Sequence, residues 1–276
     1  MMINRSQLKF HETFQPDLTY LAKILDLASQ GFSGSKFEIS ELTGIPTGKQ
    51  KGKVEPHIKY AAFMGLVEYT MDNGVYTLSL SLLGKEIFVQ DRFLHENLTH
   101  WLCHYGLSRR DLGAPQWTYL VRNGHSGFYQ RNSSGHHLDK ANTLFGTHVD
   151  FEEMFGVVKR CYTEGILAGI HYLNWGDGPV FIEHSERPEL LFMYAYAILD
   201  SWGHIFPGAR EITRTELVEQ IEIGRIFNIG DEEIDSILDN LDFEGILKVN
   251  RQLYPPTIIC MSTLDDVVSQ LYSRLL

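Results

Sequence analysis

The apolar positions near the start of the chain recur with a helical period. Pro16 and Asp17 suit the first turn of a helix, and the apolar residues that follow repeat at helical spacing until Gly31. A short second helix is predicted over residues 38–42 and a third over residues 53–67. The first third of the chain is therefore expected to begin with three helices.

A hairpin pattern follows the third predicted helix. The turn sequence Asp72-Asn73-Gly74 separates two strand-like segments, residues 66–70 and 75–80. Three helices followed by a hairpin are the order of parts in a winged helix, with the hairpin as the wing. The pattern predicts an N-terminal winged-helix DNA-binding domain over residues 1–90.

Basic residues surround the start of the third predicted helix. Pro56 is tolerated only in the first helical turn, so the lysines just before it lie at the helix entrance. Helix starts and lysines both bind phosphates, and the predicted DNA contacts are Lys49, Lys51, Lys53, His57 and Lys59. The alternative interpretation is a solvated turn.

Residues 91–185 predict a mainly helical middle region. The chain becomes polar and rich in glycine and serine near residues 123–135, which indicates a flexible loop. A helical pattern returns over residues 151–168, and a turn is expected at residues 175–179.

The last third repeats the plan of the first, and it is acidic. The expected elements are helices over 190–202, 214–227 and 231–245 and strands over 247–250 and 257–260. The third of these helices contains six acidic residues: Asp231, Glu232, Glu233, Asp235, Asp239 and Asp242. We predict an acidic winged-helix-like domain over residues 186–276 that does not bind DNA. The fold class is mainly α (α+β), with winged helix-turn-helix domains at both ends.

Charge is distributed unevenly along the 276 residues, whose formal net charge is −11. Residues 1–90 hold 9 basic and 9 acidic residues, and residues 91–185 hold 8 and 10. Residues 186–276 hold 7 basic and 16 acidic residues. An acidic surface repels phosphates, so we expect DNA at the N-terminal third and protein partners at the C-terminal third.

Cysteine usage and hydropathy suggest a compartment. The three cysteines are far apart and form no CxxC pair, which fits a reducing environment. The longest apolar run, residues 190–199, is too short to span a bilayer. We expect a cytoplasmic protein that does not contact a membrane.

Two polar clusters are candidate catalytic sites. His11 and Glu12 precede the first helix, where they could bind a metal, activate water, or lock the N-terminal strand onto the wing. His136, His137 and Asp139 lie beside the predicted loop and could form a nuclease centre with Mg²⁺ or Mn²⁺. Solvated loop residues are the alternative for this second cluster.

Several short motifs occur in an order that resembles the SspB-type family. They are Phe10-His11-Glu12-Thr13-Phe14, Gly48-Lys49, Ile58-Lys59-Tyr60, Phe63-Met64-Gly65-Leu66, Leu78-Ser79 with Gly84, and the stretch 91–105 with Trp101, Leu102 and His104. Together they cover roughly the first 120 residues. One departure is Ala61, where the family pattern leads us to expect an aromatic residue.

The resemblance implies a role in DNA phosphorothioation, in which sulfur replaces a non-bridging phosphate oxygen on one strand, and in antiphage defence. It implies that the protein engages double-stranded DNA and nicks it, and that a cysteine desulfurase and a sulfotransfer ATPase are its partners. A homodimer is compatible with the sequence. The alternative function is a non-enzymatic DNA-binding adaptor or transcriptional regulator that recruits partner proteins.

Overall fold

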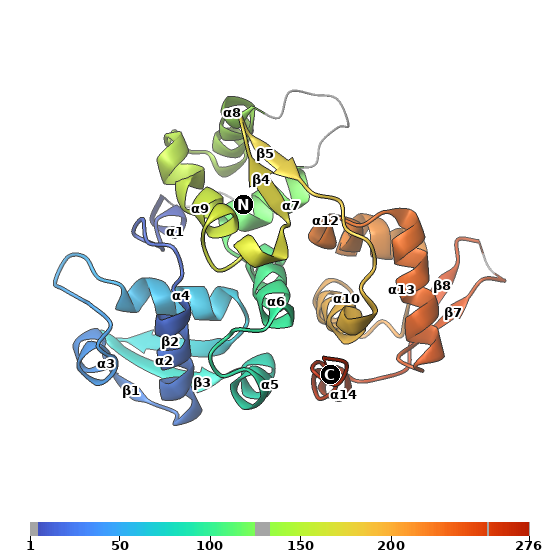
Figure 1. Ribbon diagram of the computed structural model, residues 1–276, viewed down its shortest axis with the longest axis horizontal. Coiled ribbons are helices and arrows are strands. Elements are labelled where there is room, and N and C mark those ends of the chain that lie inside the picture. The colour runs from blue at the N-terminus through green and yellow to red at the C-terminus, as the bar shows by residue number, and fades with distance from the viewer. Residues whose placement is uncertain (1–4, 125–132, 253, 276) are drawn as a thin grey trace. The chain divides into compact units, whose positions relative to one another are not determined.

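Helices and small antiparallel sheets build the part of the chain that the computed structural model describes, residues 5–124, 133–252 and 254–275 (Figure 1). The chain divides into two compact units, Met1–Phe181 and Ile182–Leu276. The mainly helical class with small sheets agrees with the prediction. A further boundary at residue 90 stays a prediction.

The first unit starts with a three-stranded sheet and the helices that pack on it. In chain order the elements are α1 (Arg5–Leu8), α2 (Leu18–Ser29), β1 (Ser33–Ser35), α3 (Lys36–Thr43), α4 (Val54–Phe63), β2 (Val67–Asp72) and β3 (Val75–Leu80). The sheet order is β1-β3-β2, with both pairs antiparallel. β1 is not predicted from sequence, because its three residues, Ser-Gly-Ser, carry no strand preference.

Local chemistry explains where these elements begin and end. The carboxylate of Asp17 accepts a hydrogen bond from the backbone N–H of Tyr20 at 3.1 Å and caps α2. Ser35 and Glu38 form a reciprocal capping box at the start of α3. The third helix is shorter than predicted because Gly65, at φ 77°, leaves the helical region just beyond its end.

The remainder of the first unit is mostly helical. It contains α5 (Leu82–Gln90), α6 (Asn97–Ser108), α7 (Pro115–Asn123), α8 (Ser134–Phe145), the π-helix η1 (Glu152–Gly156), α9 (Val157–Thr163), the 3-10 helix η2 (Ala168–Ile170), and the hairpin β4 (Leu173–Trp175) and β5 (Pro179–Phe181). α6 is buried along almost its whole length and forms the centre of this core. Residues 125–132, most of the predicted flexible loop, lie outside the described residues.

The second unit has its own three-stranded sheet. Its elements are η3 (Pro188–Leu190), α10 (Leu191–Ile205), β6 (Glu211–Thr213), α11 (Arg214–Glu216), the π-helix η4 (Leu217–Ile221), α12 (Ile223–Phe227), α13 (Asp231–Phe243), β7 (Leu247–Asn250), β8 (Thr257–Cys260) and α14 (Leu264–Val268). The sequence predicts one helix over 214–227, but Glu222 at φ 64° interrupts it. The sheet order, β6-β8-β7, repeats that of the first unit.

Within the described residues, no helix combines the length and the apolar character needed to cross a membrane.

Candidate functional site

The loop between α3 and α4 carries the predicted DNA-binding lysines. It is closed by a hydrogen bond from the backbone N–H of Lys53 to the carbonyl oxygen of Pro46 at 2.7 Å. The loop is tight at Gly52, where a Cβ atom would clash with Thr47. Lys49 and Lys51 are exposed on this loop, and neither forms an ion pair with any described residue. The loop therefore presents two unneutralised positive charges on a short, constrained turn.

The loop leads directly into the start of α4. No side chain caps this helix, whose N-cap residue is Lys53. A helix start exposes backbone N–H groups and the positive end of the helix dipole, so anions bind there. The ammonium of Lys53 lies 5.3 Å from the ring centroids of both Phe14 and Tyr20. These cation–π contacts hold Lys53 beside the helix start without neutralising it.

His57 connects α4 to α2 and is fully buried. Its Nε2 accepts a hydrogen bond from the backbone N–H of Asp17 at 3.1 Å, so its Nδ1 carries the proton and donates to the carbonyl oxygen of Lys53 at 2.6 Å. Burial lowers the pKa of His57 and favours the neutral ring that both bonds require. His57 therefore positions the helix start, and its ring is not exposed for a contact with DNA.

His11 and Glu12 fasten the N-terminal segment to the lysine loop and the core. Glu12 Oε2 accepts a hydrogen bond from the backbone N–H of Gly52 at 3.2 Å, and Tyr60 donates its hydroxyl hydrogen to the carbonyl oxygen of Phe14 at 2.9 Å. His11 Nδ1 accepts from the backbone N–H of Thr13 at 3.0 Å. The lock considered in the sequence analysis therefore exists as hydrogen bonds, but it reaches the loop before α4 instead of the wing.

This segment is strained and has a neutral histidine. Glu12 and Thr13 have φ angles of 48° and 76°, which are unusual for residues other than glycine. Arg160 Nη2 donates to the carbonyl oxygen of Thr13 at 3.2 Å, and Gln116 Nε2 donates to that of Leu8 at 2.6 Å. Burial, followed by charge repulsion from Arg160, lowers the pKa of His11 to about 4. His11 is therefore neutral at pH 7.

The second predicted cluster is divided by burial. His136, His137 and Asp139 all lie on α8, but His137 is fully buried whereas Asp139 is exposed. Both ring nitrogens of His137 lack a hydrogen-bond partner among the described residues. Burial, followed by repulsion from His136, lowers its pKa to about 4. The helix therefore does not present the three side chains together to one ligand.

A metal centre is not preformed in the described part of the chain. Within residues 5–124, 133–252 and 254–275, no group of three or more His, Cys, Asp or Glu side chains is arranged to hold a metal ion. These described side chains therefore form no complete protein cage for the predicted Mg²⁺ or Mn²⁺, and we derive no chemical step through the metal.

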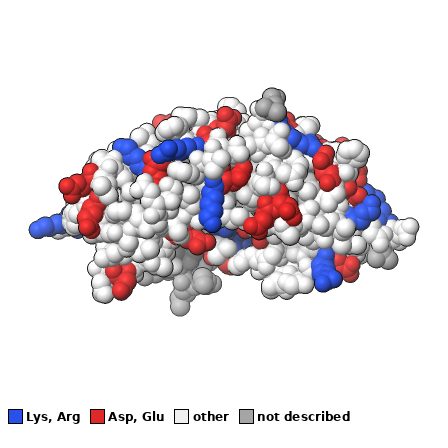
Figure 2. Space-filling model, turned by 90° about the horizontal axis from the view of Figure 1, so that it is seen from below, with Lys and Arg blue, Asp and Glu red and all other residues white. Residues whose placement is uncertain are grey.

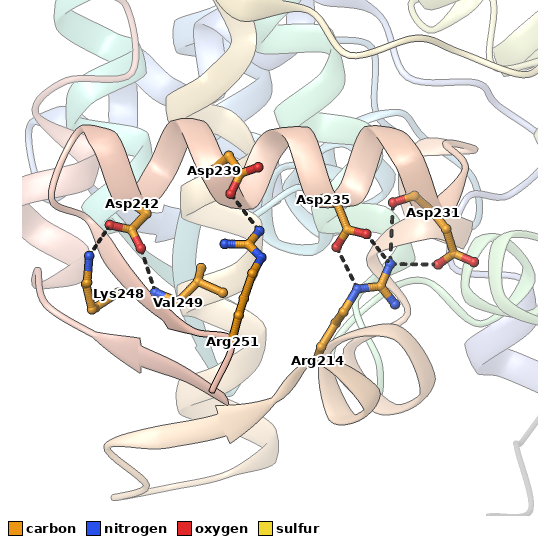
Figure 3. A network of polar contacts seen from close by, with 8 residues as sticks. All are labelled: Arg214, Asp231, Asp235, Asp239, Asp242, Lys248, Val249 and Arg251. Atoms are coloured by element: carbon orange, nitrogen blue, oxygen red, sulfur yellow. Dashed lines mark hydrogen bonds and ion pairs between the residues drawn. The ribbon is translucent and has the colours of Figure 1, made fainter. Parts of the chain in front are cut away.

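In the second unit, four aspartates of α13 form ion pairs with nearby cations (Figure 3). Arg214 forms a two-pronged contact with Asp235, with Nε–Oδ1 at 2.7 Å and Nη2–Oδ2 at 3.1 Å, and its Nη2 lies 3.0 Å from Asp231. The remaining ion pairs on this face are Arg251–Asp239 at 2.6 Å and Lys248–Asp242 at 2.8 Å. The cations of this face are therefore engaged by aspartates of α13.

On one face of the molecule, positive charge does not gather in a broad patch. On the face shown in Figure 2, Lys and Arg side chains are interspersed with Asp and Glu side chains. The lysine loop is a local feature, and its charge acts at short range because salt screens exposed charges beyond about 8–10 Å.

Sequence reasoning misses the groups that support the loop. Gln116 and Arg160 contact the N-terminal segment from more than one hundred positions along the chain, and neither belongs to a recognisable motif. Lys36, which pairs with Glu55 at 2.8 Å, could be found from its position directly after the capping Ser35.

These features define a class: a two-unit, mainly helical protein in which each unit has a three-stranded antiparallel sheet of the same order. No protein-family model and no curated protein matches the chain. The fold is that of the SspB type, because two solved SspB structures align with 97% of this chain and with 87% of their own.

The two SspB structures are similar to this chain to nearly the same degree. A magnesium ion-bound SspB crystal structure gives a TM-score of 0.76 at 15% sequence identity, and an SspB crystal structure gives 0.75 at 17%. At such identity the likeness shows a shared fold.

Proposed function

We propose that this protein is the DNA-binding component of an SspB-type phosphorothioation system, and that residues 1–90 form a winged helix that meets DNA through α4. The observation that carries the proposal is the pair of exposed, unpaired lysines, Lys49 and Lys51, at an uncapped helix start. Helix N-termini and lysines are standard partners of phosphate oxygens. The SspB-type fold supports the link to phosphorothioation.

The rigidity of the loop supports the same proposal. Phosphate contacts set the register of a protein on DNA only if the contacting groups are held in place. Glu12 ties the loop at Gly52, and the loop closes on itself between Pro46 and Lys53. The lysines are thus presented from a fixed backbone.

The proposal is tested by measuring duplex DNA binding as a function of salt concentration. The double variant K49A/K51A should weaken binding and reduce the slope of log K against log [salt] by about 0.9 for each lysine that contacts a phosphate. The control K85A/R210A removes the same charge from exposed positions elsewhere and should leave the slope unchanged. Equal slopes for both double variants would exclude the loop as the DNA contact.

Metal-dependent nicking is the second candidate, favoured by one similar structure that contains magnesium. Mg²⁺ commonly keeps several waters and uses one or two carboxylates with substrate phosphates, so DNA itself could complete its coordination. Supercoiled plasmid incubated with Mg²⁺, Mn²⁺ or EDTA separates the two functions. Nicking that requires metal and is lost in E12Q or D139N identifies an enzyme, and retardation without nicking identifies an adaptor.

A further inference from the structure

A cavity of about 520 Å³ lies in the first unit, among α4, β2, α7 and α8. Its volume is within the range of small-molecule pockets. Aromatic side chains from five separate parts of the chain line it: Phe10, Phe63, Tyr69, Tyr119 and Phe145. No motif in the sequence brings these residues together, so the cavity is a product of the tertiary fold.

The aromatic lining is ordered by ring contacts. Phe10 and Phe63 meet edge to face with centroids 4.8 Å apart, and Tyr119 and Phe145 meet similarly at 6.0 Å. Phe10, Tyr119 and Phe145 are buried, whereas Phe63 is half-exposed. The cavity therefore has a fixed aromatic floor and an accessible aromatic rim, which suits a flat ring that enters from solvent.

The charges of the lining exclude one class of ligand and favour another. Lys59 and Asp111 are its two charged residues, so the cavity has no excess of either sign. The carboxylate of Asp111 would repel the several negative charges of a polyphosphate, and Lys59 alone could not compensate for that repulsion. An uncharged heterocycle with a single phosphate near Lys59 fits this balance, and Asn123 supplies an amide donor and acceptor for the ring edge.

The cavity adjoins the proposed DNA contact through α4. Lys59 follows Lys53 by six residues, a distance of about 9 Å along the helix axis, and Phe63 follows Lys59 by one further turn. The helix that would meet phosphates at its start thus carries a lysine and an aromatic ring of the cavity further along. We propose that this cavity receives one unstacked nucleobase of the bound DNA, an inference that rests on the proposed function.

Three duplexes test the inference with the full chain: one with a single bulged 2-aminopurine, one with an abasic residue at the bulge, and one fully paired. The bulged base should bind about tenfold more tightly than the abasic bulge, because stacking on aromatic side chains stabilises an unpaired base. If the bulged and abasic duplexes bind with equal affinity and binding stays salt-sensitive, the inference that the cavity receives a base is overturned, whereas the proposed DNA-binding function stands. Absence of salt-sensitive binding to all three overturns both.

Two variants assign the effect to the cavity. F63A should reduce the ratio of bulged to abasic affinity to about one while affinity for the paired duplex stays unchanged. F93A, which removes an exposed phenylalanine outside the cavity, should retain the ratio. If F63A does not fold, as judged by circular dichroism, Y69A removes a second rim ring. An unchanged ratio in a folded rim variant would overturn the inference.

Discussion

The two three-stranded regions of this protein share an architecture and differ in surface chemistry. Both have the same strand order, both have a capping box at the helix that follows the first strand, and both place a left-handed glycine before the hairpin. Yet α4 is preceded by exposed lysines, whereas α13 carries aspartates that pair with nearby cations. The features that determine the fold are therefore separable from those that determine what the surface can bind.

One ion pair occurs at the same place in both regions. Lys36 is the first residue of α3 and pairs with Glu55 of α4, while Arg214 is the first residue of α11 and pairs with Asp235 of α13. A cation at a helix start opposes the helix dipole, so each depends on the acid of the neighbouring helix. In the second region this pair belongs to a larger network, because Arg214 also pairs with Asp231 and two further ion pairs lie along α13.

The largest expected effect is on stability, and it tests how the helix after the hairpin packs in each of the two regions. In the first region, a Cβ atom at Gly84, the third residue of α5, would overlap the carbonyl oxygen of Leu66, whereas the third residue of α14 in the second region is Asp266. G84A should therefore lower the free energy of unfolding by about 3 kcal/mol, at the upper end of overpacking costs. G169A lies in the same unit, its new methyl group meets no atom within 4 Å, and as the control it should be nearly neutral.

Urea unfolding in a W202F background measures this effect in the first unit alone. The tryptophans that remain, Trp101, Trp117 and Trp175, all lie in Met1–Phe181. A G84A protein as stable as G169A would show that α5 can move away from the hairpin without loss of stability.

The next effect, about 2 kcal/mol for each of two histidines between pH 6.5 and pH 5, should follow from acidification. His11 and His137 both have a folded-state pKa of about 4, below the usual value of 6.5. Between pH 6.5 and pH 4 these two histidines bind protons in the unfolded chain but stay neutral in the folded unit. Stability is therefore retained above pH 6.5 and falls as the pH decreases from 6.5 to 4. Each histidine should contribute at most about 1.4 kcal/mol of loss per pH unit in this window.

The same W202F fluorescence assay, at pH 7.5 and pH 5, checks this expectation. H137Q replaces a side chain that titrates with one that does not, so it should flatten the pH dependence even if it lowers stability at pH 7.5. An unchanged slope in H137Q would assign the acid sensitivity to other groups.

The smallest effect compares the two ion pairs directly. R214A should cost about 1 kcal/mol because it releases both Asp231 and Asp235, which are partly exposed. K36A should cost about half as much, since Glu55 keeps a hydrogen bond from the hydroxyl of Tyr76 at 2.7 Å. Urea titration followed by circular dichroism measures both, and a larger loss for K36A would contradict the proposed elaboration of the network.

Periodicity and caps predicted much of the secondary structure, because these signals act over a few residues. The helix after Asp17, the hairpin around Asn73-Gly74 and the repeat of this plan in the last third are present in the structure. The break at Glu222 was not predicted, since its left-handed backbone has no signature in the residue type.

By itself, the sequence determined the order of elements, the uneven charge, and the position of the lysines before α4. The tertiary structure decided which of these residues are available: it buried His57 and His137, tied Glu12 to Gly52, and paired the aspartates of α13. It also assembled the aromatic cavity from distant segments. The physical reason is range: caps and turns form among neighbours in sequence, whereas burial, ion pairing and cavities depend on long-range contacts that local patterns do not contain.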